Sequence, residues 1–267
     1  MGGIEVIVTT AGRTTEDMIE KAKQTALELE SRYVTRRKRS VLSVMEAEQE
    51  DCIVVGKNRL ELYPLGEETP FFFHPNSSMF RIKRLLKGEK DPFIEAAQLE
   101  AGMSILDCTL GLASDSIVAS FAVGETGNIV GVEGNPYLAY IVNKGLKQWN
   151  SGIDVMNEAM RRITIQQNDS LDVLRKLNDK SFDCVYFDPM FEETILESDG
   201  IRGLTKFASA EGLSTEMMKQ AHRVARKRII LKDHFRSSRF AQFYFTVHRR
   251  KSAKFHFGVI EKTENNI

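Results

Sequence analysis

Four acidic residues stand at or just after the ends of apolar segments whose β-branched content predicts strands. They are Asp107, Glu133, Asp169 and Asp188. In an open α/β sheet, ligands bind at the carboxyl ends of the parallel strands. If these segments are neighbouring parallel strands, we expect the four carboxylates to meet at one edge. There they could bind a ligand that carries a positive charge and several hydroxyl or amino donors.

The turn after the first of these segments indicates which kind of ligand could bind there. Residues 107–115 read Asp-Cys-Thr-Leu-Gly-Leu-Ala-Ser-Asp, and Gly111 would let the backbone approach a cofactor closely. A dinucleotide site needs the pattern G-x-G-x-x-G to seat a pyrophosphate, and only one of these glycines is present. Asp107 would repel a pyrophosphate but suits the positively charged aminoacyl and sulfonium end of S-adenosylmethionine. The pattern therefore disfavours a nicotinamide dehydrogenase.

The next two acids could bind the nucleoside part of the same cofactor. Glu133 ends the segment Asn128–Glu133 and can accept hydrogen bonds from both ribose hydroxyls. The loop Asn168-Asp169-Ser170 could offer an acceptor to the adenine amino group and a backbone N–H to a ring nitrogen. The same loop could equally be a helix N-cap, and the two roles can coexist.

The most informative segment is residues 183–191, which read Asp-Cys-Val-Tyr-Phe-Asp-Pro-Met-Phe. An apolar strand ends in Asp188-Pro-Met-Phe, similar to the (Asp/Asn)-Pro-Pro-(Tyr/Phe) tetrapeptide of methyltransferases that act on exocyclic amino groups of bases. Such an amine is a poor nucleophile, because its lone pair is delocalised into the ring. Asp188 and the carbonyl of Pro189 could accept its two N–H bonds and orient the lone pair, while Phe191 could stack on the base.

These residues together resemble the bacterial small-subunit ribosomal RNA guanine-N2 methyltransferase family. The resemblance covers roughly residues 75–260 and is most specific in segments 107–115 and 188–191, although Ala113 and Ser114 replace a glycine and an arginine of the family pattern. It implies cofactor contacts at Ser114, Asp115, Glu133, Gly134, Asp169, Ser170 and Asp188. The whole predicted cofactor site is Asp107, Thr109, Gly111, Ser114, Asp115, Glu133, Gly134, Asp169, Ser170 and Asp188. The predicted catalytic residues are Asp188, Pro189 and Phe191.

Charge distribution favours a polyanionic partner, although each basic cluster could also be an ordinary solvated surface. The formal net charge is +0, yet residues 220–256 hold eleven Lys or Arg and one acid, Asp233. Smaller basic clusters occupy residues 36–39 and 81–90. The family resemblance implies that this polyanion is RNA, ribosomal RNA or a ribosomal subunit, and we expect its phosphates near Arg81, Lys83, Arg84 and Lys232.

Alternating strand and helix patterns from about residue 90 predict the elements that position these residues. Strands are expected at 104–107, 128–133, 162–166, 183–188 and 228–232, followed by a pair at 243–249 and 254–261. The predicted fold is α/β, a Rossmann-like seven-stranded sheet of the class I methyltransferase type. The predicted divisions are a small α/β N-terminal unit (1–70), a linker and basic segment (71–95) and the S-adenosylmethionine-dependent methyltransferase domain (96–267).

Other features narrow the remaining choices. Cys52, Cys108 and Cys184 form no CxxC pair, no metal-ligand spacing occurs, and no apolar stretch approaches the roughly 18 residues that span a bilayer. No signal peptide is recognisable, so we expect a cytoplasmic protein without a membrane partner. Two alternatives stay open: a methyltransferase acting on a small molecule or a protein, and a non-catalytic RNA-binding protein with a degenerate cofactor fold. The oligomeric state is not predicted.

Overall fold

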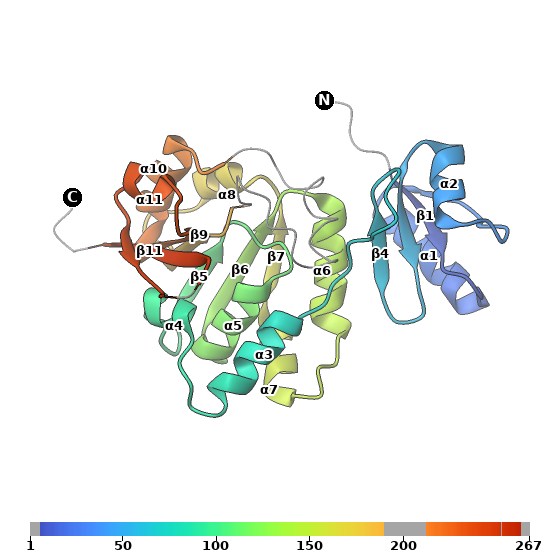
Figure 1. The fold of residues 1–267 in the computed structure, drawn as a ribbon. Helices are drawn as coiled ribbons and strands as arrows, with labels where there is room; N and C mark the ends of the chain where they lie inside the picture. The colour runs from blue at the N-terminus through green and yellow to red at the C-terminus, as the bar shows by residue number, and fades with distance from the viewer. Residues whose placement is uncertain (1–5, 190–211, 252, 263–267) are drawn as a thin grey trace. The chain divides into compact units, whose positions relative to one another are not determined.

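Two sheets organise the residues that the computed structural model describes, which are 6–189, 212–251 and 253–262 (Figure 1). The chain divides into two compact units. The first contains residues 6–74 and 136–145, and the second contains the other described residues. No helix in the described ranges is long and apolar enough to cross a bilayer.

The first unit contains a four-stranded sheet in the order β2-β1-β3-β4. β1 is parallel to β2 and β3, and β4 closes an antiparallel hairpin with β3. Two helices begin at side-chain caps, since Thr15 accepts the N–H of Met18 and Ser40 accepts that of Ser43. The elements are β1 (Val6–Thr10), α1 (Glu16–Glu28), β2 (Arg32–Tyr33), α2 (Val41–Glu48), β3 (Asp51–Val55) and β4 (Leu60–Tyr63).

The second unit contains the seven-stranded sheet that the sequence predicts, in the order β10-β11-β9-β8-β5-β6-β7. β11 is antiparallel to both of its neighbours, β9 and β10, and the other four pairs of strands are parallel. The strands are β5 (Ser104–Asp107), β6 (Asn128–Glu133), β7 (Thr164–Gln167), β8 (Phe182–Phe187), β9 (Ala225–His234), β10 (Thr246–His248) and β11 (Phe255–Glu261). The α/β class and the seven-stranded Rossmann-like sheet are therefore confirmed.

Helices accompany this sheet because alternate strand residues are apolar on both faces. Val185, Ile229 and Leu231 pack with residues of α8 and α10 on one face. On the other face Phe93 of α4 packs on the Tyr186 ring, with 4.6 Å between centroids. The helices of this unit are α3 (Asn76–Leu85), α4 (Pro92–Ala97), α5 (Ser114–Val123), α7 (Asp154–Arg162), α8 (Ser170–Lys176), α10 (Thr215–Val224) and α11 (Arg239–Gln242). Residues 136–145 of the remaining helix, α6 (Pro136–Gln148), belong to the first unit.

Some boundaries differ from the sequence predictions for identifiable reasons. Residues 76–85, interpreted as part of a linker, form α3, because Ser78 and Ile82 lie on one helical face and are buried. The strand expected at 162–166 starts later, because Arg162 still belongs to α7. The strand expected at 243–249 shortens to Thr246–His248, because Phe245 is buried in a turn after α11.

The register of the parallel strands brings the predicted site to one sheet edge. Asp107, the last residue of β5, lies level with Gly131 of β6 and Tyr186 of β8. Phe187 at the end of β8 lies level with Leu231 of β9, so Asp188 follows beside Lys232. The carboxyl ends of four neighbouring strands thus present their acids and one lysine together.

Candidate active site

The loop after β5 is held by the first of the strand-ending acids. Asp107 is 2% exposed; its Oδ1 accepts the Thr109 N–H at 3.0 Å, and its Oδ2 accepts the Ser116 hydroxyl at 2.6 Å. Thr109 Oγ1 in turn accepts the backbone N–H of Asp188 at 2.6 Å. Burial raises the pKa of Asp107 to about 7, although the hydrogen bonds from Ser116 and Thr109 oppose this shift. Asp107 thus joins the loop after β5 to the turn after β8.

Two residues let this loop turn sharply against β6. Gly111 has φ 47° and Ala113 has φ 59°, so both are in the left-handed region. A Cβ added at Gly131 of β6 would lie 2.3 Å from Leu110 Cδ1, so only glycine leaves room for the loop to pack there. Ala113 stands where glycine is favoured, at a cost of about 1–2 kcal/mol.

Glu133 lies at the end of β6 with both carboxylate oxygens turned to this loop region. Oε2 accepts the N–H of Gly111 at 3.3 Å, and Oε1 accepts that of Asn135 at 2.9 Å. A carboxylate has about four acceptor positions, so each oxygen can take a further hydroxyl donor. Burial raises the pKa of Glu133, and the backbone amides of Asn135, Gly111 and Gly134 oppose this shift. The residue therefore fits a ligand with two adjacent hydroxyls.

The loop before α8 contains the helix cap that its sequence allows and leaves one side-chain acceptor available. Asp169 caps the helix, because its Oδ1 accepts the N–H groups of Leu171 at 2.9 Å and Asp172 at 3.1 Å. Among the described residues nothing donates to the second oxygen of this exposed side chain, so it can accept an amino group. The Ser170 hydroxyl donates to the Cys108 carbonyl at 2.5 Å and ties this loop to β5.

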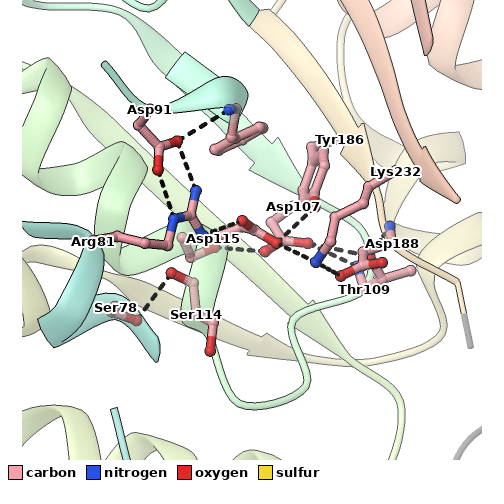
Figure 2. A network of polar contacts seen from close by, with 12 residues as sticks. Ser78, Arg81, Asp91, Asp107, Thr109, Ser114, Asp115, Tyr186, Asp188 and Lys232 are labelled. Atoms are coloured by element: carbon pink, nitrogen blue, oxygen red, sulfur yellow. Dashed lines mark hydrogen bonds and ion pairs between the residues drawn. The ribbon is translucent and has the colours of Figure 1, made fainter. Parts of the chain in front are cut away.

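A chain of alternating charges supports the acid after β8 (Figure 2). Lys232 Nζ lies 2.6 Å from Asp188 Oδ2 and 3.0 Å from Asp115 Oδ2. Asp115 also accepts the Tyr186 hydroxyl at 2.7 Å and Arg81 NH1 at 2.5 Å. Arg81 makes a two-point ion pair with Asp91, at 2.7 and 2.8 Å. Three carboxylates thus alternate with two cations.

This arrangement gives its acids different proton affinities. Although burial alone would raise it, the charges of Lys232 and Arg81 hold the pKa of Asp115 far below its usual range. Burial raises the pKa of Asp188 to about 6 despite the attraction of Lys232. Burial disfavours the charged amine, yet Asp115 and Asp188 raise the pKa of Lys232 above its usual value. At neutral pH both Asp188 and Lys232 are therefore charged.

The residues predicted to contact RNA differ in their exposure and in their partners. Arg81 is 18% exposed and uses its guanidinium on two acids, whereas Lys83 and Arg84 lie on the exposed side of α3, with Arg84 paired to Glu89 at 2.6 Å. Lys232 is 23% exposed and is paired with Asp188 and Asp115, and RNA contact by any of these residues stays a prediction. Phe191 lies outside the described residues.

Other predicted residues line the same edge. Pro189 directly follows Asp188 and Gly134 follows Glu133, while Ser114 opens α5 and its carbonyl accepts the Ser78 hydroxyl at 3.0 Å. Sequence reasoning missed Tyr186, Asp91 and Ser116. The available signal for the first was its position two residues before Asp188, on the opposite strand face from Val185 and Phe187.

Comparison with solved structures defines the class. The structure superposes on the SAM-dependent methyltransferase NGO1261 from Neisseria gonorrhoeae with a TM-score of 0.60 and 16% identity, covering 96% of this chain and 95% of that one. At this identity the likeness concerns the fold, that of class I S-adenosylmethionine-dependent methyltransferases. The acids at the carboxyl edge occupy the place where ligands bind in such sheets.

Sequence comparison then gives the family. Residues 35–255 match the family described as "Putative SAM-dependent methyltransferase", and the chain belongs to this family. It is 48% identical over 255 residues to the "Uncharacterized protein YpiP" of Bacillus subtilis (strain 168), covering 96% of this chain and 99% of that one. It is 32% identical over 145 residues to "Ribosomal RNA small subunit methyltransferase J" of Francisella tularensis subsp. novicida (strain U112), covering 54% of this chain and 57% of the relative. The protein is an S-adenosylmethionine-dependent methyltransferase.

Proposed function

We propose that this methyltransferase transfers the methyl group to the exocyclic amine of an RNA base, guanine N2 of ribosomal RNA. The observation that carries the proposal is Asp188, placed at the carboxyl edge by β8 and held from two sides. Its N–H is bound by Thr109, and its Oδ2 is bound by Lys232. Among the described residues nothing donates to Oδ1, so this oxygen can accept an N–H of an incoming amine.

Asp188 orients the amine and receives its proton. When bound, S-adenosylmethionine supplies a methyl group already activated by the positive charge on sulfur. Hydrogen bonding to Asp188 and to the Pro189 carbonyl turns the nitrogen lone pair out of conjugation with the base ring. As positive charge develops on nitrogen, the carboxylate stabilises it and accepts the proton. A carboxyl group with a pKa of about 6 is a better base at neutral pH than one at its usual value.

The cofactor side of the edge fits S-adenosylmethionine by its donor and acceptor pattern. Glu133 would bind the ribose hydroxyls, the second oxygen of Asp169 the adenine amino group, and the Gly111 loop the aminoacyl end. Asp107, whose oxygens are both bound inside the protein, supports this loop without presenting a free carboxylate. Asp115 has the same supporting role toward Lys232.

Two further facts support an RNA substrate. The relative from F. tularensis named for ribosomal RNA methylation shares 32% identity over 57% of its length. Basic residues are also concentrated at 81–90 and 220–256. Phosphate contacts made by such residues predict activity that falls steeply as salt rises. A cytoplasmic enzyme acting on RNA is the function that these features favour together.

Radiolabelled methyl transfer to total RNA from cells that lack this protein tests the proposal. We expect label in RNA and, after digestion, N2-methylguanosine by mass spectrometry. Asp188→Ala should abolish transfer while the Kd for S-adenosylmethionine changes by less than about tenfold. Normal turnover by this variant would refute the role of Asp188. Label in small molecules or protein with salt-independent rates would refute the RNA substrate, and the absence of thermal stabilisation by saturating S-adenosylmethionine would indicate a non-catalytic protein.

A further inference from the structure

Phe235 is an exposed aromatic ring close to the proposed methyl-acceptor site. It lies directly after β9 and is 45% exposed. Lys232, which binds Asp188 at 2.6 Å, is three residues earlier on this strand. At about 3.3 Å per strand residue, the backbone of Phe235 lies no more than about 10 Å from that of Lys232. One nucleotide step in an extended single strand covers most of this distance.

The surrounding backbone holds the ring in place. The Phe235 N–H donates to the Lys254 carbonyl at 3.0 Å, and Ser237 N–H donates to the His234 carbonyl at 2.8 Å. The ring centroid lies 4.5 Å from that of His234 and 6.2 Å from that of His256. The ring therefore packs beside two tilted imidazoles and needs little ordering to bind a flat ligand.

One cation packs against this ring, and further cations lie on a turn at the same edge of the sheet. The Arg236 guanidinium carbon lies 5.0 Å from the ring centroid. β10 ends level with Phe257 and β11 begins level with His234, so the turn between them lies at the same edge as Phe235. This turn carries Arg249, Arg250, Lys251 and Lys254.

The acid in this stretch does not neutralise these cations. Asp233 is 2% exposed, and its Oδ2 is bound by Arg239 at 2.9 Å and by Ser237 at 2.6 Å. The surface formed by Phe235, Arg236 and the basic turn is thus a flat aromatic face beside several positive charges. A single-stranded nucleic acid has the complementary pattern, since each nucleotide pairs a flat base with a phosphate.

We propose that Phe235 stacks on a base adjacent to the target nucleotide, while Arg236 and the basic turn bind the neighbouring phosphates. This inference rests on the proposed RNA substrate and assigns its binding surface. Stacking tolerates any base, because every base has a π face. Phe235 is therefore a substrate-binding residue that positions the strand, and Asp188 then selects the amine.

Binding of a short oligouridine with one central guanosine, followed by fluorescence anisotropy, tests this assignment. Phe235→Leu keeps an apolar side chain but removes the aromatic face, and Phe235→Trp enlarges that face. Tyr244→Leu is the matched control, because Tyr244 is 90% exposed and precedes β10, toward the opposite end of these strands. The same oligonucleotide with abasic sites on both sides of the guanosine removes the proposed stacking partner.

We expect Phe235→Leu to weaken RNA binding by about 5- to 150-fold, the range that base stacking on an aromatic side chain accounts for. Phe235→Trp should bind at least as tightly as the wild type, and Tyr244→Leu should be unchanged. On the abasic oligonucleotide, the wild type and Phe235→Leu should bind equally. Affinity for S-adenosylmethionine should stay the same in all variants, which shows that the fold is intact.

The outcomes separate this inference from the proposed function. If the wild type methylates RNA and Phe235→Leu binds the intact oligonucleotide as tightly as the wild type, the stacking role alone is overturned. An equal loss in Phe235→Leu on intact and abasic RNA also overturns it. If the wild type binds S-adenosylmethionine but neither binds nor methylates RNA, the proposed substrate is wrong and the stacking role falls with it.

Discussion

Replacing Lys232 by methionine removes the positive charge beside Asp188 and keeps a side chain of similar length. An opposite charge within hydrogen-bond distance lowers the pKa of a carboxyl group by about 1–3. Lys232 Nζ lies 2.6 Å from Asp188, whose pKa is about 6 in its presence. Without this charge we expect the acid limb of the rate profile to move upward by about 1–3 pH units.

A shift of this size changes the ionised fraction of Asp188 at neutral pH, and with it the rate. A carboxyl group with a pKa of about 6 is about 90% ionised at pH 7, and one with a pKa of about 8 is about 10% ionised. If methyl transfer requires the carboxylate, Lys232→Met should lose about tenfold in kcat at pH 7 and recover most of it near pH 9. Single-turnover methyl transfer across this pH range measures the limb directly.

A matched variant separates this effect from a general loss of lysine. Lys227→Met removes a half-exposed lysine from the same strand, 3.8 Å from Asp183 at the other end of β8. Its pH profile should match that of the wild type. An acid limb that stays near pH 6 in Lys232→Met, or a loss that is equal at every pH, would refute the coupling between the two side chains.

Three further predictions concern the supporting residues. Glu133→Ala should weaken S-adenosylmethionine binding at least about tenfold, measured by calorimetry, because hydrogen bonds to a charged acceptor each contribute about 1.5–3 kcal/mol. The control Asp183→Ala, at the amino end of β8, should leave the Kd for S-adenosylmethionine unchanged. An equal effect of both substitutions would contradict the assignment of Glu133 to the cofactor site. Arg81→Ala should cost about 3–5 kcal/mol in the free energy of unfolding, because Asp91 and Asp115, each 5% exposed, lose their shared partner; a denaturation midpoint equal to that of Lys83→Ala would disprove this. The pKa of Asp107 is raised to about 7 in the folded state, so the folded protein should lose stability as pH rises from about 4 to about 7, and Asp107→Asn should flatten this dependence in thermal melts.

The sheet and the acids at its edge were predictable because they depend on local pattern. Alternation of strand and helix predicts parallel strands, and parallel strands bring Asp107, Glu133 and Asp188 to one edge without further information. The Asp188-Pro189 turn was recognisable because an apolar strand precedes it. Such features depend on residues that are close together in the chain, so they can be recognised in a single sequence.

The pairing of charges was not predictable, because it joins residues far apart in the chain. Arg81 looked like a solvent-facing member of a basic cluster, yet its partner Asp115 is 34 residues away. Lys232 and Asp188 are 44 residues apart. Composition gives the number of such charges but not which of them lose their water on folding. The exposure of Phe235 is hidden as well, since an aromatic residue shortly after the buried run Ile229–Leu231 reads as part of the same core.

The ion pairs of Arg81 have a consequence for how this enzyme can be shortened. A chain beginning at residue 96, the predicted start of the methyltransferase domain, would keep every strand of the seven-stranded sheet. It would lack α3 and Asp91, whose side chain caps α4 by accepting the N–H groups of Phe93 and Ile94. Asp115 would then retain Lys232 as its single cation, and that amine would be drawn away from Asp188. We therefore expect the smallest active fragment to begin ahead of α3, at about residue 75, where the second unit starts.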